Sequence, residues 1–398
     1  MELHRTTLSE VLHKLPQLED LNHHEHFDLV IACSGFEPRT VAVARHLAEG
    51  GTSARTCVYL TYSTNPEENE GQRGDLIEQL SRLSSSVHPL LADTDDPAFL
   101  RDFYDHLKAE ESDRAVRVLF DISGASGRLI LRVLRALFDA EDDVAHVDLT
   151  ISYAQALEYL PDQATADATI AALKNPDLDN SGSDATLRTL GLDFDADSKV
   201  LGIEHPGEHL ETLADRAVII CGFNHDRLRA ALDHIDPSFN TEHPHPQATF
   251  IVGLPPAPEL RWRYEAMLGI NGLDDPEARI DLHDASTLDY TDLLTKLEII
   301  YDQTMLEHER MTIVPFGSKL QSVAAAMFLE MHRDVRVVLA MPRNYSTTGY
   351  SHGVGELTQL ALGPLHAVRD TLLSVGTLSI TGSPLTGKGS TGSAPAGI

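Results

Sequence analysis

The sequence predicts an α/β protein built from two tandem Rossmann-like domains with mostly parallel sheets. Apolar runs of strand length alternate with segments of helical periodicity along most of the chain. The strand runs are apolar almost throughout, which is typical of parallel strands buried on both faces. The alternation also occurs twice, with a polar zone between the two copies, and 398 residues are enough for two hydrophobic cores.

The first half alternates between strands and helices from residue 27 onwards. We expect strands at 27–33, 56–62, 87–91, 116–122 and 147–152, and helices at 40–48, 71–83, 97–108 and 126–139. A regular β-α alternation indicates a mostly parallel sheet with helices on both faces.

The second half repeats this order. We expect strands at 217–221, 248–253, 279–282, 311–314 and 335–340, and helices at 226–234, 260–268, 290–301 and 318–331. Gly222 follows Gly35 by 187 residues, and Val314 follows Ile122 by 192. An almost constant offset between matching elements indicates an internal duplication.

The domain boundaries follow from changes in composition. We expect an N-terminal helix and link at 1–26, a first domain at 27–160, a polar linker or excursion at 161–215 and a second domain at 216–365. The segment 375–398 is rich in Gly, Ser and Thr, which predicts a disordered tail.

The charge balance restricts the partners. There are 61 acidic and 31 basic residues, and a net charge of −30 repels duplex nucleic acid and anionic membranes. The N-terminus lacks a signal sequence, and no apolar run approaches the ~20 residues that span a bilayer. The three cysteines show no metal-binding spacing. We therefore expect a cytoplasmic protein with no metal and no cofactor, which binds a nucleotide-type small molecule and either a protein partner or a second copy of itself.

Ligands of open α/β sheets bind beyond the carboxyl ends of the strands. The turn after the first strand contains Gly35, Phe36 and Arg39. Gly35 allows close approach of a ligand to the backbone, and the guanidinium of Arg39 suits an anionic group. The alternative is a tight turn in which Arg39 pairs with Glu37.

The turn after the fourth strand of each half combines glycine, serine and a cation at a helix start. Exposed backbone N–H groups there favour anions. In the first half the alternative is a tight turn in which Ser126 caps the helix. The residues concerned are Ser123, Gly124, Ser126 and Arg128 in the first half, and Gly317, Ser318 and Lys319 in the second.

Two further groups in the second half are candidate ligand contacts. Gly222 and Asn224 follow its first strand, and Arg343, Asn344 and Tyr345 follow its fifth. The latter three suit stacking and hydrogen bonding to a base or sugar, and they also suit an ordinary polar loop.

The turn at 314–319, which reads VPFGSK, resembles the strand–Gly-Thr-Lys–helix element of CARF domains. The segment 121–124, DISG, is similar to the approach to that element, and two fused units would resemble SAVED domains. Ser318 stands where those domains have threonine, and Ser126-Gly127-Arg128 replaces Gly-Thr-Lys in the first half. The resemblance covers 27–160 and 216–350. It implies a Rossmann-like sensor of cyclic oligonucleotides, of the kind used in prokaryotic antiviral defence.

Three functions remain open. The first is a sensor that binds a nucleotide-type ligand between the two halves. The second is an enzyme acting on a nucleotide or phosphoester, with Asp121 and Glu37 as acid and base and with Arg39, Arg128 and Lys319 stabilising charge. The third is a scaffold subunit of a larger complex.

Overall fold

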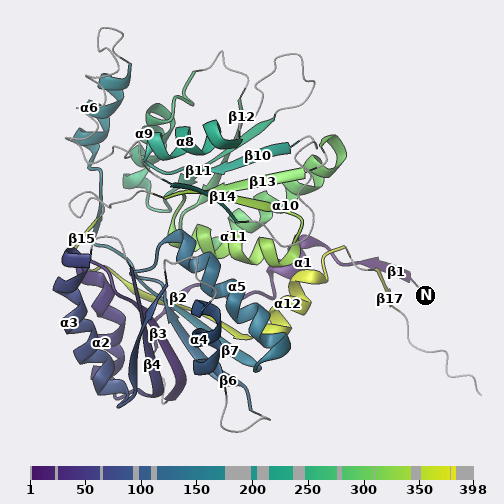
Figure 1. Cartoon of the computed structure of the whole chain (residues 1–398). Helices are drawn as coiled ribbons and strands as arrows, with labels where there is room; N and C mark the ends of the chain where they lie inside the picture. The colour runs from purple at the N-terminus through teal and green to yellow at the C-terminus, as the bar shows by residue number, and fades with distance from the viewer. Residues whose placement is uncertain are drawn as a thin grey trace, which may run out of the picture.

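Figure 1 shows a computed structural model of the chain, in which two sheets lie on either side of a central helical layer. The structure describes the following residues: 2–22, 26–62, 66–92, 98–108, 114–174, 199–203, 215–235, 247–275, 280–308, 310–341, 351–376 and 378–381.

The first sheet has seven strands in the order β2-β16-β7-β6-β3-β4-β5. Its parallel strands are β3 (His26–Cys33), β4 (Ser53–Thr61), β5 (Val87–Leu91), β6 (Val116–Asp121) and β7 (Val147–Ala154). β16 (Leu357–Pro364) and β2 (Glu19–Asp20) extend it beyond β7. One face packs against α2 (Ala42–Glu49) and α3 (Pro66–Leu83), and the other against α4 (Ala98–Leu107), α5 (Gly127–Asp143) and α12 (Leu365–Leu373).

The second sheet has six strands in the order β12-β11-β10-β13-β14-β9. Its parallel strands are β10 (Asp215–Ile220), β11 (Ala248–Leu254), β12 (Asp281–Ser286), β13 (Arg310–Pro315) and β14 (Arg336–Met341), and β9 (Lys199–Ile203) is antiparallel to β14. α8 (His225–Ile235) and α9 (Trp262–Ile270) cover one face, and α10 (Tyr290–Glu307) and α11 (Lys319–Met331) cover the other.

Both sheets therefore arrange five successive parallel strands in the order 3-2-1-4-5, with an antiparallel strand beside the fifth. This confirms the predicted α/β class with two Rossmann-like units. The expected strands and helices form close to their predicted positions, although short 3-10 turns at Pro38–Val41 and Pro258–Leu260 precede α2 and α9.

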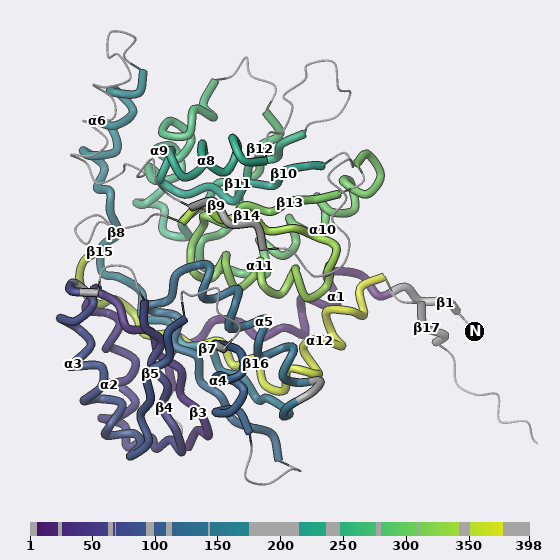
Figure 2. Tube along the Cα trace, in the orientation of Figure 1, coloured from purple at the N-terminus to yellow at the C-terminus, as the bar shows by residue number. Residues whose placement is uncertain are grey.

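The two antiparallel strands are exchanged between the halves. After β7, the chain passes through β8 (Glu158–Tyr159) and α6 (Gln163–Leu173) to β9, which pairs with β14 of the second sheet. After β14, the chain passes through β15 (Ser351–His352) to β16, which pairs with β7 of the first sheet. β8 and β15 pair with each other where the two crossings meet. Figure 2 follows both paths along the chain.

This exchange changes the domain boundaries that composition suggests. The zone 161–215, which we expect to be a polar linker or excursion with one short helix around 165–173, contains that helix as α6 and also the strand β9. The segment 357–364 belongs to the first sheet rather than to the second domain. Part of the expected tail, Leu378–Thr381 (β17), pairs with β1 (Glu2–Arg5), whereas 382–398 lies outside the described residues. Each of these pairings joins strands far apart in sequence, which local hydrophobic patterns do not encode.

The halves share one hydrophobic core. α5 packs on α11 between the sheets, and a single cluster of buried side chains runs from Ile31 and Phe120 in the first sheet to Ile220 and Ile313 in the second. Short α1 (Leu8–Leu12) joins this layer, where the backbone oxygen of Pro16 accepts a hydrogen bond from Tyr290 (2.8 Å). The halves are therefore held together by interior packing.

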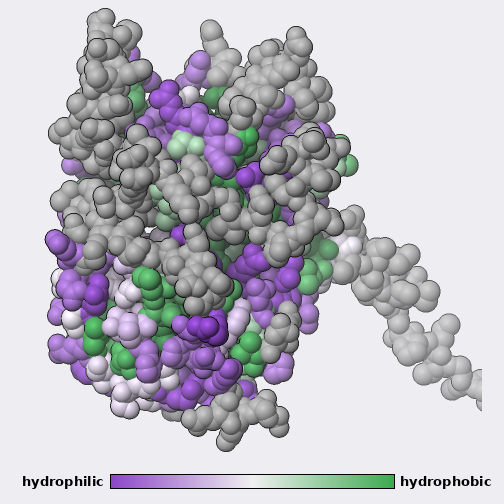
Figure 3. Space-filling model, in the orientation of Figure 1, coloured by the Kyte–Doolittle hydropathy of each residue, from purple (hydrophilic) through white to green (hydrophobic). Residues whose placement is uncertain are grey.

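The surface of the described residues is mixed. Hydrophilic and apolar residues are interspersed on the face in Figure 3, and Leu306 and Leu157 are the most exposed of the large apolar side chains, at 88% and 70%. Among the described residues, no helix has the length and apolar character needed to cross a membrane.

Candidate functional site

The carboxyl edge of the first sheet has its switch in strand order between β3 and β6, the first and fourth parallel strands. Open α/β sheets bind ligands at such a point. Ser34 follows β3, Asp121 ends β6, and Ser152 lies opposite Asp121 on β7. All three are buried.

Arg39 and Glu37 form an enclosed ion pair at this edge. Nη2 of Arg39 donates to Oε1 and Oε2 of Glu37 at 3.1 and 2.9 Å, and the two side chains are only 6% and 12% exposed. Nη1 of Arg39 donates to the hydroxyl of Tyr153 at 3.3 Å. The alternative that pairs Arg39 with Glu37 is thus the arrangement found, and it lies inside the molecule rather than on a surface turn.

The exchanged segments contact this ion pair. Tyr159 on β8 places its hydroxyl 2.6 Å from that of Tyr153, and Ser351 on β15 donates a hydrogen bond to Oε1 of Glu37. The guanidinium of Arg39 lies 5.6 Å from the centre of the Tyr159 ring, within the range of a cation–π interaction. The place where the chain crosses between the halves therefore borders the site.

Asp121 is buried next to the ion pair. Its Oδ1 accepts hydrogen bonds from the backbone N–H and the hydroxyl of Ser123, at 2.9 and 2.5 Å. The hydroxyl of Ser123 in turn accepts the N–H of Ala154 at 2.8 Å. Ser123 is therefore occupied in joining the ends of β6 and β7.

Lys319 reaches this site from the second half. It is the first residue of α11, and its Nζ donates to the backbone oxygen of Ala125 in the first half at 2.5 Å. Its charge interacts with those of Glu37, Arg39 and Asp121. The site is therefore completed by both halves of the chain.

Burial and neighbouring charges shift the pKa values of Glu37, Arg39, Asp121 and Lys319. Burial raises the pKa of Asp121 to about 6 and lowers that of Lys319 to about 8, against the attraction between them. Burial raises the pKa of Glu37, but the charges of Arg39 and Lys319 and the hydrogen bond from Ser351 together outweigh it and hold the pKa of that carboxyl below its usual value. Glu37 is thus an ionised partner of Arg39, whereas Asp121 and Lys319 change charge nearer to neutral pH.

Several buried polar atoms at this edge have no partner among the described residues. They are the hydroxyls of Ser34 and Ser152, Oδ2 of Asp121 and Nε of Arg39. Buried polar groups without partners are uncommon, and each costs free energy unless a ligand or water satisfies it. Their clustering at a strand switch is typical of a binding site.

The glycines of these turns serve close packing of the chain. A Cβ on Gly124 would lie 2.5 Å from the backbone oxygen of Cys33, and one on Gly222 would lie 2.6 Å from that of Phe316. In both halves glycine thus lets the turn after the fourth strand press against the turn after the first. Gly35 lies against Gly124, and Gly317 lies against Gln321 and Ile220.

The two predicted serine caps are present. Ser126 accepts the N–H of Leu129 at 3.3 Å, and Ser318 forms a capping box with Gln321. The hydroxyl of Ser318 also donates to the backbone oxygen of Thr287 at 2.6 Å. Ser126 therefore acts in the helix-cap role that is the alternative to ligand binding, and Ser318 has the same role in the second half.

The other predicted residues are dispersed. Arg128 lies half-buried in the first turn of α5, and Phe36 is half-buried after β3. Asn224 accepts the N–H of Arg227 at the start of α8, at 2.9 Å, in the turn that also contains Gly222. Arg343, Asn344 and Tyr345 lie outside the described residues.

The halves differ at the first position of the helices that face each other. Ser126 caps α5 and Ser318 caps α11, so Gly127 is the counterpart of Lys319. A Cβ on Gly127 would lie 3.1 Å from the hydroxyl of Ser322. The second half thus inserts the side chain of Lys319 into the first half. At the equivalent position the first half has Gly127, which has no side chain to insert into the second half.

Sequence reasoning missed three residues of the site. Tyr62 donates to the backbone oxygen of Gly124 at 3.0 Å and accepts the N–H of Ser126 at 2.9 Å, which fixes the turn before α5. Tyr62 is the last residue of the predicted second strand, and a tyrosine at the carboxyl end of a parallel strand is a signal from which a site residue could be predicted. For Tyr159 and Ser351 no local signal exists, because they arrive through the exchanged segments.

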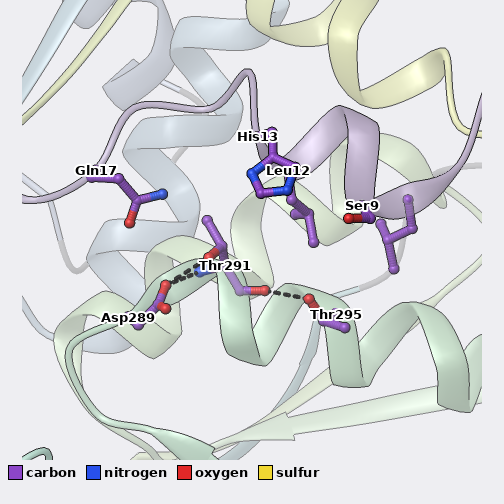
Figure 4. Close-up of a pocket in the computed structure, with 8 residues that line it drawn as sticks. Ser9, Leu12, His13, Gln17, Asp289, Thr291 and Thr295 are labelled. Carbon is purple, nitrogen blue, oxygen red and sulfur yellow. Dashed lines mark hydrogen bonds between the residues drawn. The ribbon is translucent and has the colours of Figure 1, made fainter.

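A separate pocket of about 460 Å³ lies between α1 and α10 (Figure 4). Its lining includes His13, Gln17, Asp289 and Thr291, and none of its eight lining residues is lysine or arginine. Oδ1 of Asp289 is used to cap α10 through Thr291. This pocket is poorly suited to an anionic ligand.

Comparison with known proteins adds little to this description. No family model and no curated protein matches the sequence. The crystal structure of MccD protein matches at 15% identity over 63% of this chain and 85% of that chain, with a TM-score of 0.18. Agreement this low carries no argument. The fold itself defines a two-unit Rossmann-like α/β protein with exchanged edge strands.

Proposed function

We propose that the protein binds a small anionic ligand of the nucleotide type at the carboxyl edge of the first sheet. The observation that carries this proposal is the insertion of Lys319 from the second half among Arg39, Asp121 and Glu37 of the first. Burying a charged lysine costs free energy, and such a cost is expected at sites where the lysine binds a ligand.

The free atoms of the site suit such a ligand. The hydroxyls of Ser34 and Ser152 and Nε of Arg39 are unused donors, which phosphate or sugar oxygens accept. Oδ2 of Asp121 is an unused acceptor, which a ligand hydroxyl or amine would satisfy. This mixture of donors, one acceptor and two cations favours a nucleotide over a simple inorganic anion.

The position of the site suits a sensor. The ligand would contact α11 through Lys319 and the crossing strands through the Glu37 partner Ser351. Binding would then change how the two halves pack, and a partner protein could respond to that change. The resemblance of the turn at 314–319 to CARF domains supports a nucleotide ligand and a role in antiviral defence.

The test is a thermal-shift screen of the full chain against mono-, di- and cyclic oligonucleotides. We expect a saturable rise in melting temperature with one class, reduced at least tenfold in apparent affinity by Lys319→Met. The matched control is Lys108→Met, because Lys108 is exposed and pairs on the surface with Asp105. The absence of a shift with every nucleotide would reject the proposal in favour of a scaffold.

An enzyme is the second candidate, and the protonation equilibria of Asp121 and Lys319 favour it, because both groups titrate near neutral pH. Incubation with the ligand found in the screen separates the two functions. Conversion of the ligand that Asp121→Asn reduces by orders of magnitude identifies an enzyme. A ligand that the wild type binds and leaves unchanged after incubation identifies a sensor.

A further inference from the structure

Three side chains with metal-binding atoms meet at the amino end of β7, the opposite end of that strand from the candidate site. Glu141 lies near the end of α5, His146 immediately precedes β7, and His366 is the second residue of α12. Their donor atoms all lie within 4.8 Å of one another.

The distances match a small coordination sphere. Nδ1 of His146 lies 2.9 Å from Oε1 of Glu141, and Nδ1 of His366 lies 3.2 Å from the same oxygen. Zinc bonds of 2.0–2.1 Å in a tetrahedron place neighbouring ligand atoms about 3.3 Å apart. An ion therefore fits here after only small movements of two exposed imidazoles.

The burial and charge of the cluster also suit a cation. The side chain of Glu141 is 3% exposed, whereas those of His146 and His366 are 66% and 57% exposed. The second oxygen of Glu141 accepts the N–H of Val147 at 2.6 Å, which fixes the carboxylate and leaves Oε1 toward the histidines. Within the described residues, the ionisable partners that the structure gives this buried carboxylate are these two histidines.

We propose that Glu141, His146 and His366 bind a divalent transition-metal ion of the zinc type. Two imidazoles and one carboxylate oxygen are ligands that zinc accepts, and water would take the fourth position. Each imidazole would bind through Nδ1 in its neutral form, with its proton on Nε2.

Such an ion would fasten the exchanged C-terminal segment to the first half. α12 directly follows β16, and His366 is separated from Glu141 by 225 residues. Metal bound to ligands so far apart stabilises the folded state, because the unfolded chain cannot present them together.

The experiment measures zinc binding to the full chain after chelator treatment and dialysis. Calorimetric titration is expected to show one site that His366→Ala or His146→Ala weakens at least tenfold. Co²⁺ is expected to give the visible absorption of a four-coordinate site, which the same variants lose. Zinc is also expected to slow hydrogen exchange in α12 and at the start of β7 in the wild type alone.

The control is His88→Ala, because His88 is exposed and stacks near His106 at 5.2 Å between ring centres without belonging to the cluster. It is expected to bind zinc as the wild type does. Both cluster histidines are exposed, and each single substitution leaves Glu141 its bond from the N–H of Val147 and one histidine partner, so we expect the fold to remain intact. Equal zinc affinity in wild type and His366→Ala, or protection that appears away from α12, would overturn the proposal in favour of a hydrogen-bonded Glu–His cluster.

Discussion

Lys319→Met removes the charge that the second half inserts into the first while keeping an unbranched side chain only one atom shorter. We expect this substitution to weaken ligand binding and, at the same time, to stabilise the unliganded protein. The two effects have the same origin, because the ammonium is placed where it serves a ligand rather than where water solvates it best.

The magnitude follows from the protonation equilibrium. Burial, with a smaller contribution from Arg39, lowers the pKa of Lys319 from 10.5 to about 8. A shift of this size corresponds to about 3 kcal/mol of unfavourable interaction with the charged form. The variant also loses the hydrogen bond from Nζ of Lys319 to the backbone oxygen of Ala125, and this loss cancels about 1 kcal/mol of the expected gain in stability. We therefore expect the free energy of unfolding at pH 7 to rise by about 2 kcal/mol.

The pH dependence gives a second and sharper expectation. The folded state holds the Lys319 proton less tightly than the unfolded chain, so the penalty is complete below about pH 8 and disappears as the pH rises towards 10.5. The wild type is expected to gain about 2 kcal/mol relative to the variant between pH 7 and pH 9.5.

The assay is urea denaturation of both proteins at several pH values, followed by circular dichroism and by the fluorescence of Trp262, the single tryptophan of the chain. The exposed-lysine variant Lys108→Met is expected to change the free energy of unfolding by only a few tenths of a kcal/mol. A Lys319→Met protein less stable than wild type at pH 7, or a wild-type-minus-variant difference that stays flat up to pH 9.5, would refute the reasoning.

Three other substitutions test separate parts of the structure by denaturation. Burial raises the pKa of Asp121 to about 6, so the ionised carboxylate destabilises the folded state above that pH. Asp121→Asn is expected to raise the free energy of unfolding by about 1–2 kcal/mol at pH 7. The variant is also expected to lack the fall in stability that the wild type shows as the pH rises from about 4 to about 6. Arg263 donates to three backbone oxygens of the segment 159–161, and Arg263→Met is expected to cost about 2 kcal/mol, whereas Arg261→Met on the exposed side should be nearly neutral. Gly124→Ala places a methyl group 2.5 Å from a backbone oxygen and is expected to cost about 2–3 kcal/mol, whereas Gly71→Ala, with open space in α3, should stabilise by about 0.5–1 kcal/mol.

The parallel strands and their helices could be predicted because their signals are local. Runs such as Phe27–Cys33 and Val116–Asp121 are apolar, strand-length and followed by turn residues. The edge strands could not be predicted in place. β9 lies in a polar zone, and β16 pairs with a strand that precedes it by about 200 residues.

The candidate site was predictable in its position and only partly in its chemistry. Glu37, Arg39, Asp121 and Lys319 are residues that the sequence indicates, and they do come together. Their spatial relation depends on how α5 packs on α11, which no motif records. The cluster of Glu141, His146 and His366 could not be predicted, because His366 reaches the other two residues only through the pairing of β16 with β7.

Arg263 and Trp262 show that an arginine–aromatic pair can have a structural role. In the structure Trp262 is half-buried against α6, and Arg263 lies over its ring at 5.0 Å while binding the crossing segment. Arg263 thus holds the exchanged segment in place through hydrogen bonds to the backbone oxygens of 159–161.

The exchange of edge strands also sets a constraint on how the chain is made. The free edge of β7 receives its partner β16 only after roughly 200 further residues have been synthesised. At about 5–20 residues per second the ribosome needs at least ten seconds or so to supply them. Throughout that interval the nascent first half presents an open β-edge to its surroundings, so its safe maturation depends on the pace of translation and on chaperones that shield such edges.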